Sequence, residues 1–295
     1  MNQLTLAIGF GLVTSAILAL GAVGFTLQFG VSNILNLAYG DVMTASAFVA
    51  YASDSAGLNP WSGMVIGGLF GAVFSVLLNR FVYTPFIRRG ARLWTMIIIT
   101  IAVALILQNC LQAIWGPDFY SARISAGATV RVLGMVFTTT QLILVAIAAV
   151  AMAALHGLLR YTRLGKAMRA TASDPALARN CGVPTRRVID GAWLLSGLLC
   201  GLAGVALVTQ LGSFEFTTGS EFLVPVIAAA MLGGVGQPYG AMLGALVIGL
   251  ASELYASYFN PTYKEVVAFL VLIVVLLLRP QGIFADAASQ KEVAA

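Results

Sequence analysis

Long apolar runs alternate along the chain with short segments that carry its charges. No charged side chain occurs in residues 1–40, 93–117 or 222–252. A helix that crosses a membrane needs about 20 predominantly apolar residues. The pattern therefore predicts an all-α, polytopic helical membrane protein with about nine hydrophobic segments, near residues 4–27, 28–51, 61–80, 93–117, 138–159, 190–210, 222–235, 241–257 and 265–279.

The number of crossings depends on two interrupted stretches. If residues 28–41 or 222–240 re-enter the membrane instead of crossing it, the count becomes eight or ten. The stretches outside the apolar runs are too short for a soluble domain, so residues 1–295 are expected to form a single transmembrane domain. Residues 160–187 are its long cytoplasmic loop, and residues 285–295 are expected to be a short disordered cytoplasmic tail.

Polar residues interrupt the second apolar stretch at a depth where lipid would not tolerate them. These residues are Asn33, Asn36, Tyr39 and Asp41, and in a protein that carries a solute across the membrane they are the candidates for its translocation path. A carboxylate in the bilayer costs about 2.5–3.5 kcal/mol, so Asp41 should face protein or water, as in a broken helix that lines a cavity. The alternative is that these side chains form interhelical hydrogen bonds that hold a broken helix in place.

Composition and charge placement exclude a soluble protein and a nucleic-acid partner. Only 9% of the residues are charged and 60% are hydrophobic, whereas soluble domains average roughly 25% charged residues. Residues 80–92 carry four Lys or Arg, residues 160–187 carry seven, and the tail from Arg279 carries two. Only Arg123, Arg131 and Lys264 fall on the opposite side, so the positive-inside rule places the basic loops and the C-terminus in the cytoplasm.

The basic loop contains a short helix whose two ends are marked in the sequence. Asp174 is a good N-cap, Pro175 fits the first helical position, and Gly182 suits a left-handed position just after the helix. A helix of two turns is unstable alone and needs a surface to lie against. We therefore favour a helix that docks on a soluble partner over an ordinary positively charged loop.

Glycines recur at spacings that let helices approach closely. One group of candidates for helix packing lies in the turn between the segments predicted at 222–235 and 241–257, which has the sequence GGVGQPYG at 233–240. The packing candidates are Gly197, Gly201, Gly233, Gly234, Gly236, Gly240 and Gly244.

Catalytic and metal-binding patterns are missing from the sequence. The Gly165-Lys166 pair lacks the rest of a phosphate-binding loop, and one histidine, His156, makes neither a metal site nor a triad. We expect no catalytic residues, no metal and no cofactor in this chain. Gln210, Glu215 and Glu221 are candidates for contact with an external partner protein, although solvated loop charges are the better interpretation. Glu253 is expected to be hydrogen-bonded or snorkelling.

Four stretches of the chain together resemble the branched-chain amino-acid ABC importer permeases, in particular the H-type of the two paired permeases. They are NILNLAYGD at 33–41, GKAMRATASDPALARNCG at 165–182, the run 225–249 with MLGGVGQPYG at 231–240, and LRPQGIF at 278–284. Tyr39 departs from the family pattern, which commonly has His before Gly-Asp.

The resemblance implies a type II-like importer fold in a bacterial inner membrane. It implies a heterodimer with a second permease, two cytoplasmic ATPase subunits that bind ATP and Mg, and a periplasmic binding protein. It also makes the short helix a coupling helix seated in the ATPase groove, formed by Asp174, Pro175, Ala176, Leu177, Ala178, Arg179, Asn180, Cys181 and Gly182. Relatives carry leucine, isoleucine and valine, other neutral amino acids, or urea and short amides. An ion-coupled carrier and a scaffold without a path are the less favoured functions.

Overall fold

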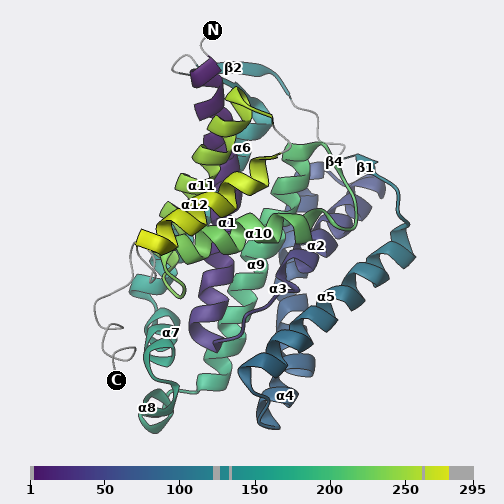
Figure 1. Ribbon diagram of the computed structural model, residues 1–295. Helices are drawn as coiled ribbons and strands as arrows, with labels where there is room; N and C mark the ends of the chain where they lie inside the picture. The colour runs from purple at the N-terminus through teal and green to yellow at the C-terminus, as the bar shows by residue number, and fades with distance from the viewer. Residues whose placement is uncertain (1–2, 122–126, 133–134, 261–262, 279–295) are drawn as a thin grey trace.

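The computed structural model describes residues 3–121, 127–132, 135–260 and 263–278 (Figure 1). A helix occupies each of the predicted apolar segments. These helices are α1 (Gln3–Ser32), α2 (Tyr39–Ser55), α3 (Pro60–Leu77), α5 (Leu93–Trp115), α6 (Thr139–Tyr161), α9 (Thr185–Leu211), α10 (Thr218–Gly233), α11 (Pro238–Tyr258) and α12 (Lys264–Leu278). The π-helix η1 (Leu78–Tyr83) and α4 (Thr84–Arg88) prolong α3, and α7 (Arg163–Ser173) and α8 (Pro175–Asn180) form the basic loop.

The chain is an all-α membrane protein in the part that the structure describes. Six helices there are long and apolar enough to cross a membrane, with η1 and α4 counted as part of α3. Helices α10 and α12 are apolar but shorter, so nine crossings remain a prediction. The first helix ends later than the predicted segment 4–27, because α1 continues to Ser32 and includes Gln28. Inside the helix bundle the side-chain oxygen of Gln28 accepts a hydrogen bond of 3.1 Å from the Ser196 hydroxyl, so one of the two polar atoms of this buried amide has a partner among the described residues.

Two small antiparallel sheets were not predicted. Strand β1 (Tyr120–Ser121) pairs with β4 (Ser213–Phe214), and β2 (Thr129–Val132) pairs with β3 (Met135–Thr138). The β1–β4 pair ties the loop after α5 to the segment after α9. Its aromatic side chains pack against Phe48 of α2, whose ring centre lies 4.9 Å from that of Phe214 in a tilted contact and 5.6 Å from that of Tyr120 in an edge-on contact.

Helices α1–α3 and α9–α11 form two similar units. Each unit has a long helix of 30 or 27 residues, a break, a short helix of 17 or 16 residues, and a third helix. The long helix of each unit packs along the third helix of the other: α1 along α11, and α9 along α3. The long helices are antiparallel, because Gly21 faces Ala203 while Gly24 faces Leu199.

The two short helices run in opposite directions from a common starting point. They begin side by side, with Gly40 of α2 against Gly219 of α10. Helix α2 then runs toward the end of the molecule where α9 finishes, since Phe48 of α2 contacts Phe214 just after α9. Helix α10 runs toward the opposite end, where Gly30 near the end of α1 meets Gly236. The units therefore form an inverted repeat, an arrangement in which transporters place half-helices near the middle of the bilayer.

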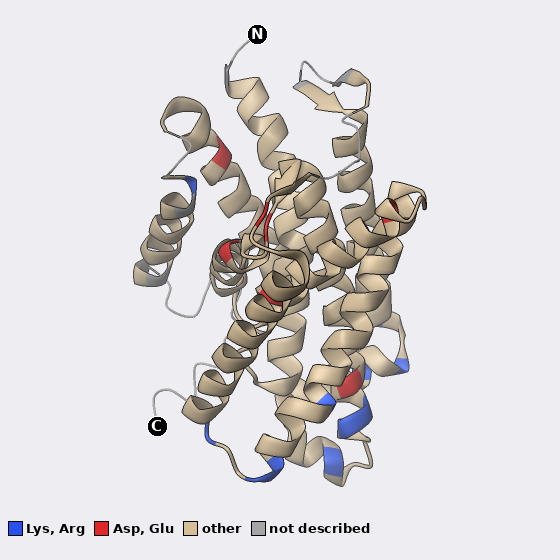
Figure 2. Ribbon diagram, turned by 90° about the vertical axis from the view of Figure 1, so that its right-hand side faces the viewer, with Lys and Arg blue, Asp and Glu red and all other residues tan. Residues whose placement is uncertain are grey.

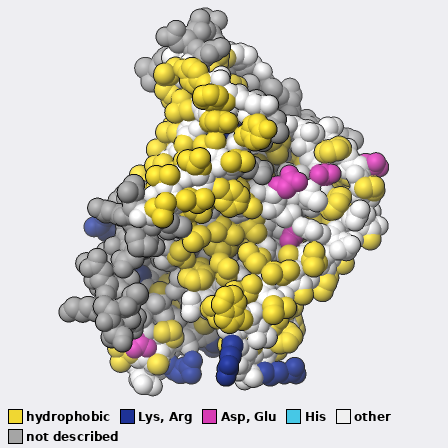
Figure 3. All heavy atoms as spheres, viewed as in Figure 1, with side chains coloured by type: hydrophobic (Ala, Val, Ile, Leu, Met, Phe, Trp, Pro, Cys, Tyr) yellow, Lys and Arg dark blue, Asp and Glu magenta, His cyan; other side chains and the backbone are white. Residues whose placement is uncertain are grey.

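Positive charge gathers at one end of the molecule. Figure 2 shows that most of the Lys and Arg residues cluster at one end of the molecule, the end that carries α4, α7 and α8 in Figure 1. Figure 3 shows hydrophobic side chains over most of one face, with most of the visible basic groups along its lower edge. This distribution is the one that the positive-inside rule expects of a membrane protein whose basic end is cytoplasmic.

Candidate transport and coupling sites

The inverted repeat brings the first turns of two half-helices together inside the protein. The backbones of Gly40 and Gly219 are so close that a Cβ atom on either residue would overlap the carbonyl oxygen of the other. The Gly219 amide donates a hydrogen bond of 2.9 Å to the Thr44 hydroxyl, which satisfies one of the free donors at the start of α10. Two partial positive helix ends therefore converge at this point.

Asp41 lies in the first turn of α2, beside this meeting point. It is fully buried, and neither of its carboxylate oxygens has a hydrogen-bond partner among the described residues. The side chains of Gln108 and Ser220, which are hydrogen-bonded to each other at 2.9 Å, lie near this carboxylate. The positive ends of α2 and α10 supply part of the stabilisation that a buried carboxylate needs.

Three of the four predicted translocation residues, Asn36, Tyr39 and Asp41, are buried inside the protein. Tyr39 is buried and donates a hydrogen bond of 3.1 Å to the Gly21 carbonyl of α1. Asn36 is buried and accepts a hydrogen bond of 3.0 Å from the Tyr83 hydroxyl. Asn33 lies apart from them, exposed and in the left-handed conformation with φ of 52°, where it follows the end of α1. A role of these residues in translocation remains a prediction.

The packing glycines lie where helix backbones meet. A Cβ atom on Gly201 of α9 would come within 2.9 Å of the Cα of Gly68 on α3. Gly197 sits one turn earlier against Gly71 in the same way. Gly233 and Gly240 touch across the turn from α10 to α11, and Gly244 lies against the Ala229 carbonyl. Gly234 and Gly236 form that turn, with φ values of 102° and 90° that favour glycine.

The short helix of the basic loop is present as α8, and it has a cap at each end. One carboxylate oxygen of Asp174 accepts hydrogen bonds from the amides of Ala176 and Leu177, at 2.8 and 2.9 Å. At the other end, Gly182 adopts φ of 82° and its amide bonds the Arg179 carbonyl, while the next amide reaches back to Ala178. These paired bonds form a Schellman motif, so the helix is closed at both ends.

Helix α8 rests on one buried residue and presents the others outward. Ala178 is buried, whereas Leu177 is 60% exposed. The loop around α8 is held by α7, whose Arg169 side chain donates a hydrogen bond to the Leu159 carbonyl at the end of α6. An exposed leucine on a helix with fixed ends, at the basic end of the molecule, is suited to docking on a soluble partner.

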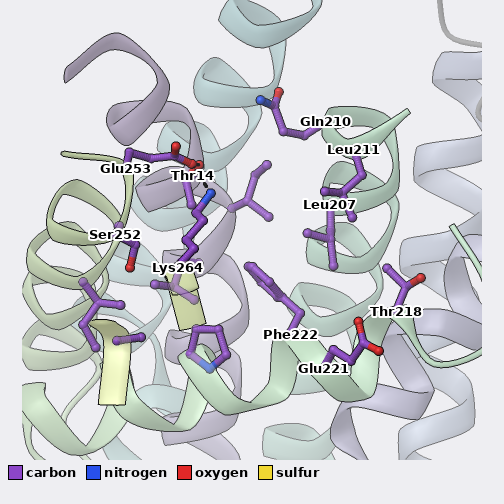
Figure 4. A pocket seen from close by; sticks show the side chains of 16 residues that line it. Thr14, Leu207, Gln210, Leu211, Thr218, Glu221, Phe222, Ser252, Glu253 and Lys264 are labelled. Atoms are coloured by element: carbon purple, nitrogen blue, oxygen red, sulfur yellow. Dashed lines mark hydrogen bonds and ion pairs between the residues drawn. The ribbon is translucent and has the colours of Figure 1, made fainter. Parts of the chain in front are cut away.

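A cavity that the sequence did not predict lies between α1, α9, α10, α11 and α12 (Figure 4). Its volume is about 300 Å³. Glu253 and Lys264 form an ion pair in its wall, and Thr14 donates a hydrogen bond of 2.6 Å to the same carboxylate oxygen. Glu253 is thus hydrogen-bonded, and Gln210 and Glu221 also line the cavity. The only feature of the sequence that points to this cavity is the position of charged residues near the ends of apolar segments.

Other polar candidates have structural partners or lie outside the cavity. His156 is in hydrogen-bond contact with the Tyr239 hydroxyl at 2.9 Å. Glu215 accepts a hydrogen bond from the Thr217 hydroxyl at 2.7 Å. Within the described ranges, no group of three or more His, Cys, Asp or Glu side chains is placed to hold a metal ion. The tail from Arg279, including the predicted LRPQGIF match and the disordered segment, lies outside the described residues.

The inverted repeat, the apolar surface and the capped loop helix define a membrane permease. The family model for the permease component of the branched-chain amino acid transport system matches residues 7–276. The chain belongs to this family and is a permease component of an ABC importer.

Individual relatives agree with this assignment. The high-affinity branched-chain amino acid transport permease LivH of Salmonella typhimurium is 31% identical, and the match covers 92% of each chain. The corresponding permease BraD of Pseudomonas aeruginosa is 30% identical over 92% of this chain and 93% of its own. Among solved structures, PsaBC from Streptococcus pneumoniae shares the fold, with a TM-score of 0.51 at 15% identity over 92% of this chain and 91% of that one.

Proposed function

We propose that this chain is the inner-membrane permease subunit of an ABC importer for branched-chain or other neutral amino acids, with its C-terminus in the cytoplasm. The similarity to LivH and BraD over nine-tenths of the chain supports this substrate class. The observation that carries the mechanism is α8, a helix closed at both ends at the basic end of the molecule.

The partners follow from this role. Helix α8, with the residues Asp174 to Gly182, inserts into a groove on a cytoplasmic ATPase subunit, and two such subunits bind the ATP and Mg. A second, homologous permease completes the membrane part, and a periplasmic binding protein delivers the substrate. Closure of the ATPase dimer moves α8, and α9, which follows α8 in the chain, transmits this motion to the half-helices that meet at Gly40 and Gly219.

The test is uptake by the complete complex in proteoliposomes. ATP is enclosed, the binding protein is supplied outside, and ion gradients are collapsed with ionophores. We expect uptake of radiolabelled leucine that stops when a non-hydrolysable ATP analogue replaces ATP, and competition by isoleucine and valine but not by urea or ribose. Uptake that persists without ATP and responds to a proton or sodium gradient would contradict the proposal, and competition by urea alone would change its substrate class.

A further inference from the structure

The cavity between α1, α9, α10, α11 and α12 has the size of a site for a small metabolite. Its volume of about 300 Å³ lies at the lower end of the range for ligand pockets. It lies toward the end opposite the basic loops, because its walls include Leu211 at the end of α9 and Lys264 at the start of α12. A molecule from the external side would therefore meet this cavity first.

One side of the cavity is charged with both signs. Glu253 and Lys264 form the only salt bridge among the residues that the structure describes, and their side chains are 15% and 37% exposed. Thr14 adds a hydroxyl to the same group. A Lys ammonium has three N–H donors and a carboxylate accepts several bonds, so the pair can bind a further group of each charge. Figure 4 shows these three side chains converging on one side of the cavity.

The middle of the cavity is apolar. Ile17 of α1, Leu207 of α9, Phe222 of α10 and Ile248 of α11 contribute to its walls. Three of these side chains are buried and Phe222 is partly buried, so the wall offers aliphatic and aromatic surface that is held in place by the surrounding helices. Such a wall favours a ligand with an uncharged, apolar group at this point, since a polar group would lose its hydration without gaining a hydrogen-bond partner.

The far side of the cavity carries hydrogen-bond acceptors. Glu221 and Thr218 lie across Phe222 from the ion pair in Figure 4. Pro225 lies inside α10 and has no amide proton, so it cannot bond the Glu221 carbonyl four residues earlier. An acidic ligand side chain that reached this side would meet a second carboxylate and be repelled.

We propose that this cavity binds an amino acid in its zwitterionic form, with a branched aliphatic side chain. Its α-carboxylate binds Lys264, its α-ammonium binds Glu253, and its side chain packs against Phe222 and the neighbouring aliphatic residues. The inference rests on the proposed function for its substrate class, and it adds a binding site within the permease itself. The site would receive the substrate on the external side before the half-helices at Gly40 and Gly219.

The test measures binding to the full chain in lipid nanodiscs, without ATPase or binding protein. We expect saturable binding of radiolabelled leucine, with competition by isoleucine and valine. Leucinamide lacks the carboxylate and 4-methylpentanoate lacks the ammonium, so both should compete at least tenfold more weakly. Lys264→Met should weaken leucine binding by roughly 10- to 100-fold, the loss of one charge-assisted contact. Lys166→Met, in the basic loop at the other end, is the matched control and should leave binding unchanged.

Lys264→Met also removes the ion pair that joins α11 to α12, so a second variant, Phe222→Ala, tests the cavity without disturbing that pair. It should weaken leucine binding about tenfold while changing alanine binding little, because only the larger side chain reaches Phe222. Equal leucine affinities in the wild type, Lys264→Met and Phe222→Ala would overturn the site, as would the absence of saturable binding. If the complete complex imports leucine while the chain alone binds none, the site is wrong and the proposed function stands. If the complex imports no neutral amino acid and the chain binds none, both are wrong.

Discussion

Gly40 and Gly219 lie in mutual backbone contact, and each occupies the space that a side chain on the other would need. Both residues stand in the first turn of a half-helix, one in each unit of the inverted repeat. The contact therefore joins the two units at the first turns of both half-helices. Because α2 and α10 run away from it in opposite directions, any shift here moves both half-helices at once.

This contact makes a strong prediction about Gly219→Ala. The new Cβ atom would overlap the Gly40 carbonyl and lie close to Thr44, both of which belong to a packed helix. Overpacking of this kind costs about 1–3 kcal/mol or more, so the variant should unfold at a lower temperature in detergent. Gly157→Ala is the control, since nothing lies within 4 Å of a Cβ atom there, and it should be neutral or slightly stabilising. Equal melting temperatures for both variants would contradict the close contact.

The hydrogen bond from the Tyr83 hydroxyl to the Asn36 side chain should contribute to the stability of the folded chain. Tyr83→Phe keeps the ring against Trp193, 5.3 Å away between ring centres, but leaves the side-chain oxygen Oδ1 of Asn36 without its donor. An unsatisfied buried acceptor costs about 1–3 kcal/mol. We expect a lower melting temperature, whereas Tyr161→Phe, at a side chain 74% exposed, should change it little. A Tyr83→Phe variant as stable as the wild type would show that the bond contributes nothing.

The helices and the capped loop could be predicted because their signals are local. An apolar run of sufficient length predicts a membrane helix wherever it lies, and Asp174, Pro175 and Gly182 mark the ends of α8 within nine residues of sequence. The burial of Asp41 was also predictable, since a carboxylate in an apolar stretch must avoid lipid.

The cavity and the inverted repeat could not be predicted in the same way. Thr14 comes from α1, far in the sequence from α10, α11 and α12, which carry Phe222, Glu253 and Lys264. No local pattern says which helices pack together. The bond from Tyr83 depends on η1, where a π-helical turn changes the direction in which side chains point. The sequence groups Asn33 with the other polar residues of the interrupted apolar stretch, but the left-handed turn at that residue places it at the surface.

Asp41→Asn should separate stability from transport. The amide has almost the shape of the carboxylate but carries no charge, so the variant avoids the cost of burying an unpaired charge, about 2.5–3.5 kcal/mol on insertion scales. If Asp41 serves translocation, the variant should melt at the same or a higher temperature while ATP-driven leucine uptake falls at least tenfold. Thermal unfolding and proteoliposome uptake measure the two effects. Undiminished uptake would leave Asp41 with a structural role alone.

Leu177 provides a test of the docking surface itself. Leu177→Glu places a charge on a side chain that is 60% exposed, so the fold of this chain should not change. In the complex the same charge would be buried against the ATPase, and we expect uptake and co-purification of the ATPase to be lost together. Phe86→Glu, at a side chain 38% exposed in α4 of the same end, is the control and should assemble normally. Retention of the ATPase by Leu177→Glu would remove α8 from the interface.

Asp174 should act through the hydrogen bonds that begin α8 and not through its charge. Asp174→Asn keeps an oxygen that can accept from the amides of Ala176 and Leu177, and asparagine is as good an N-cap as aspartate. Asp174→Ala removes both bonds and costs about 0.5–2 kcal/mol, which a helix of six residues cannot absorb. We therefore expect ATP-driven uptake to be nearly normal in Asp174→Asn, strongly reduced in Asp174→Ala, and abolished in Asp174→Lys.

Membrane insertion separates this prediction from a general folding defect. Asp174 is exposed and outside the apolar helices, so all three variants should insert, and their membrane helices should melt like those of the wild type even where α8 itself unfolds. Uptake that falls equally in Asp174→Asn and Asp174→Ala would mean that the negative charge itself meets the ATPase. Normal uptake in Asp174→Lys would contradict coupling through α8, because a lysine there both removes the cap and places a positive charge beside the positive start of the helix.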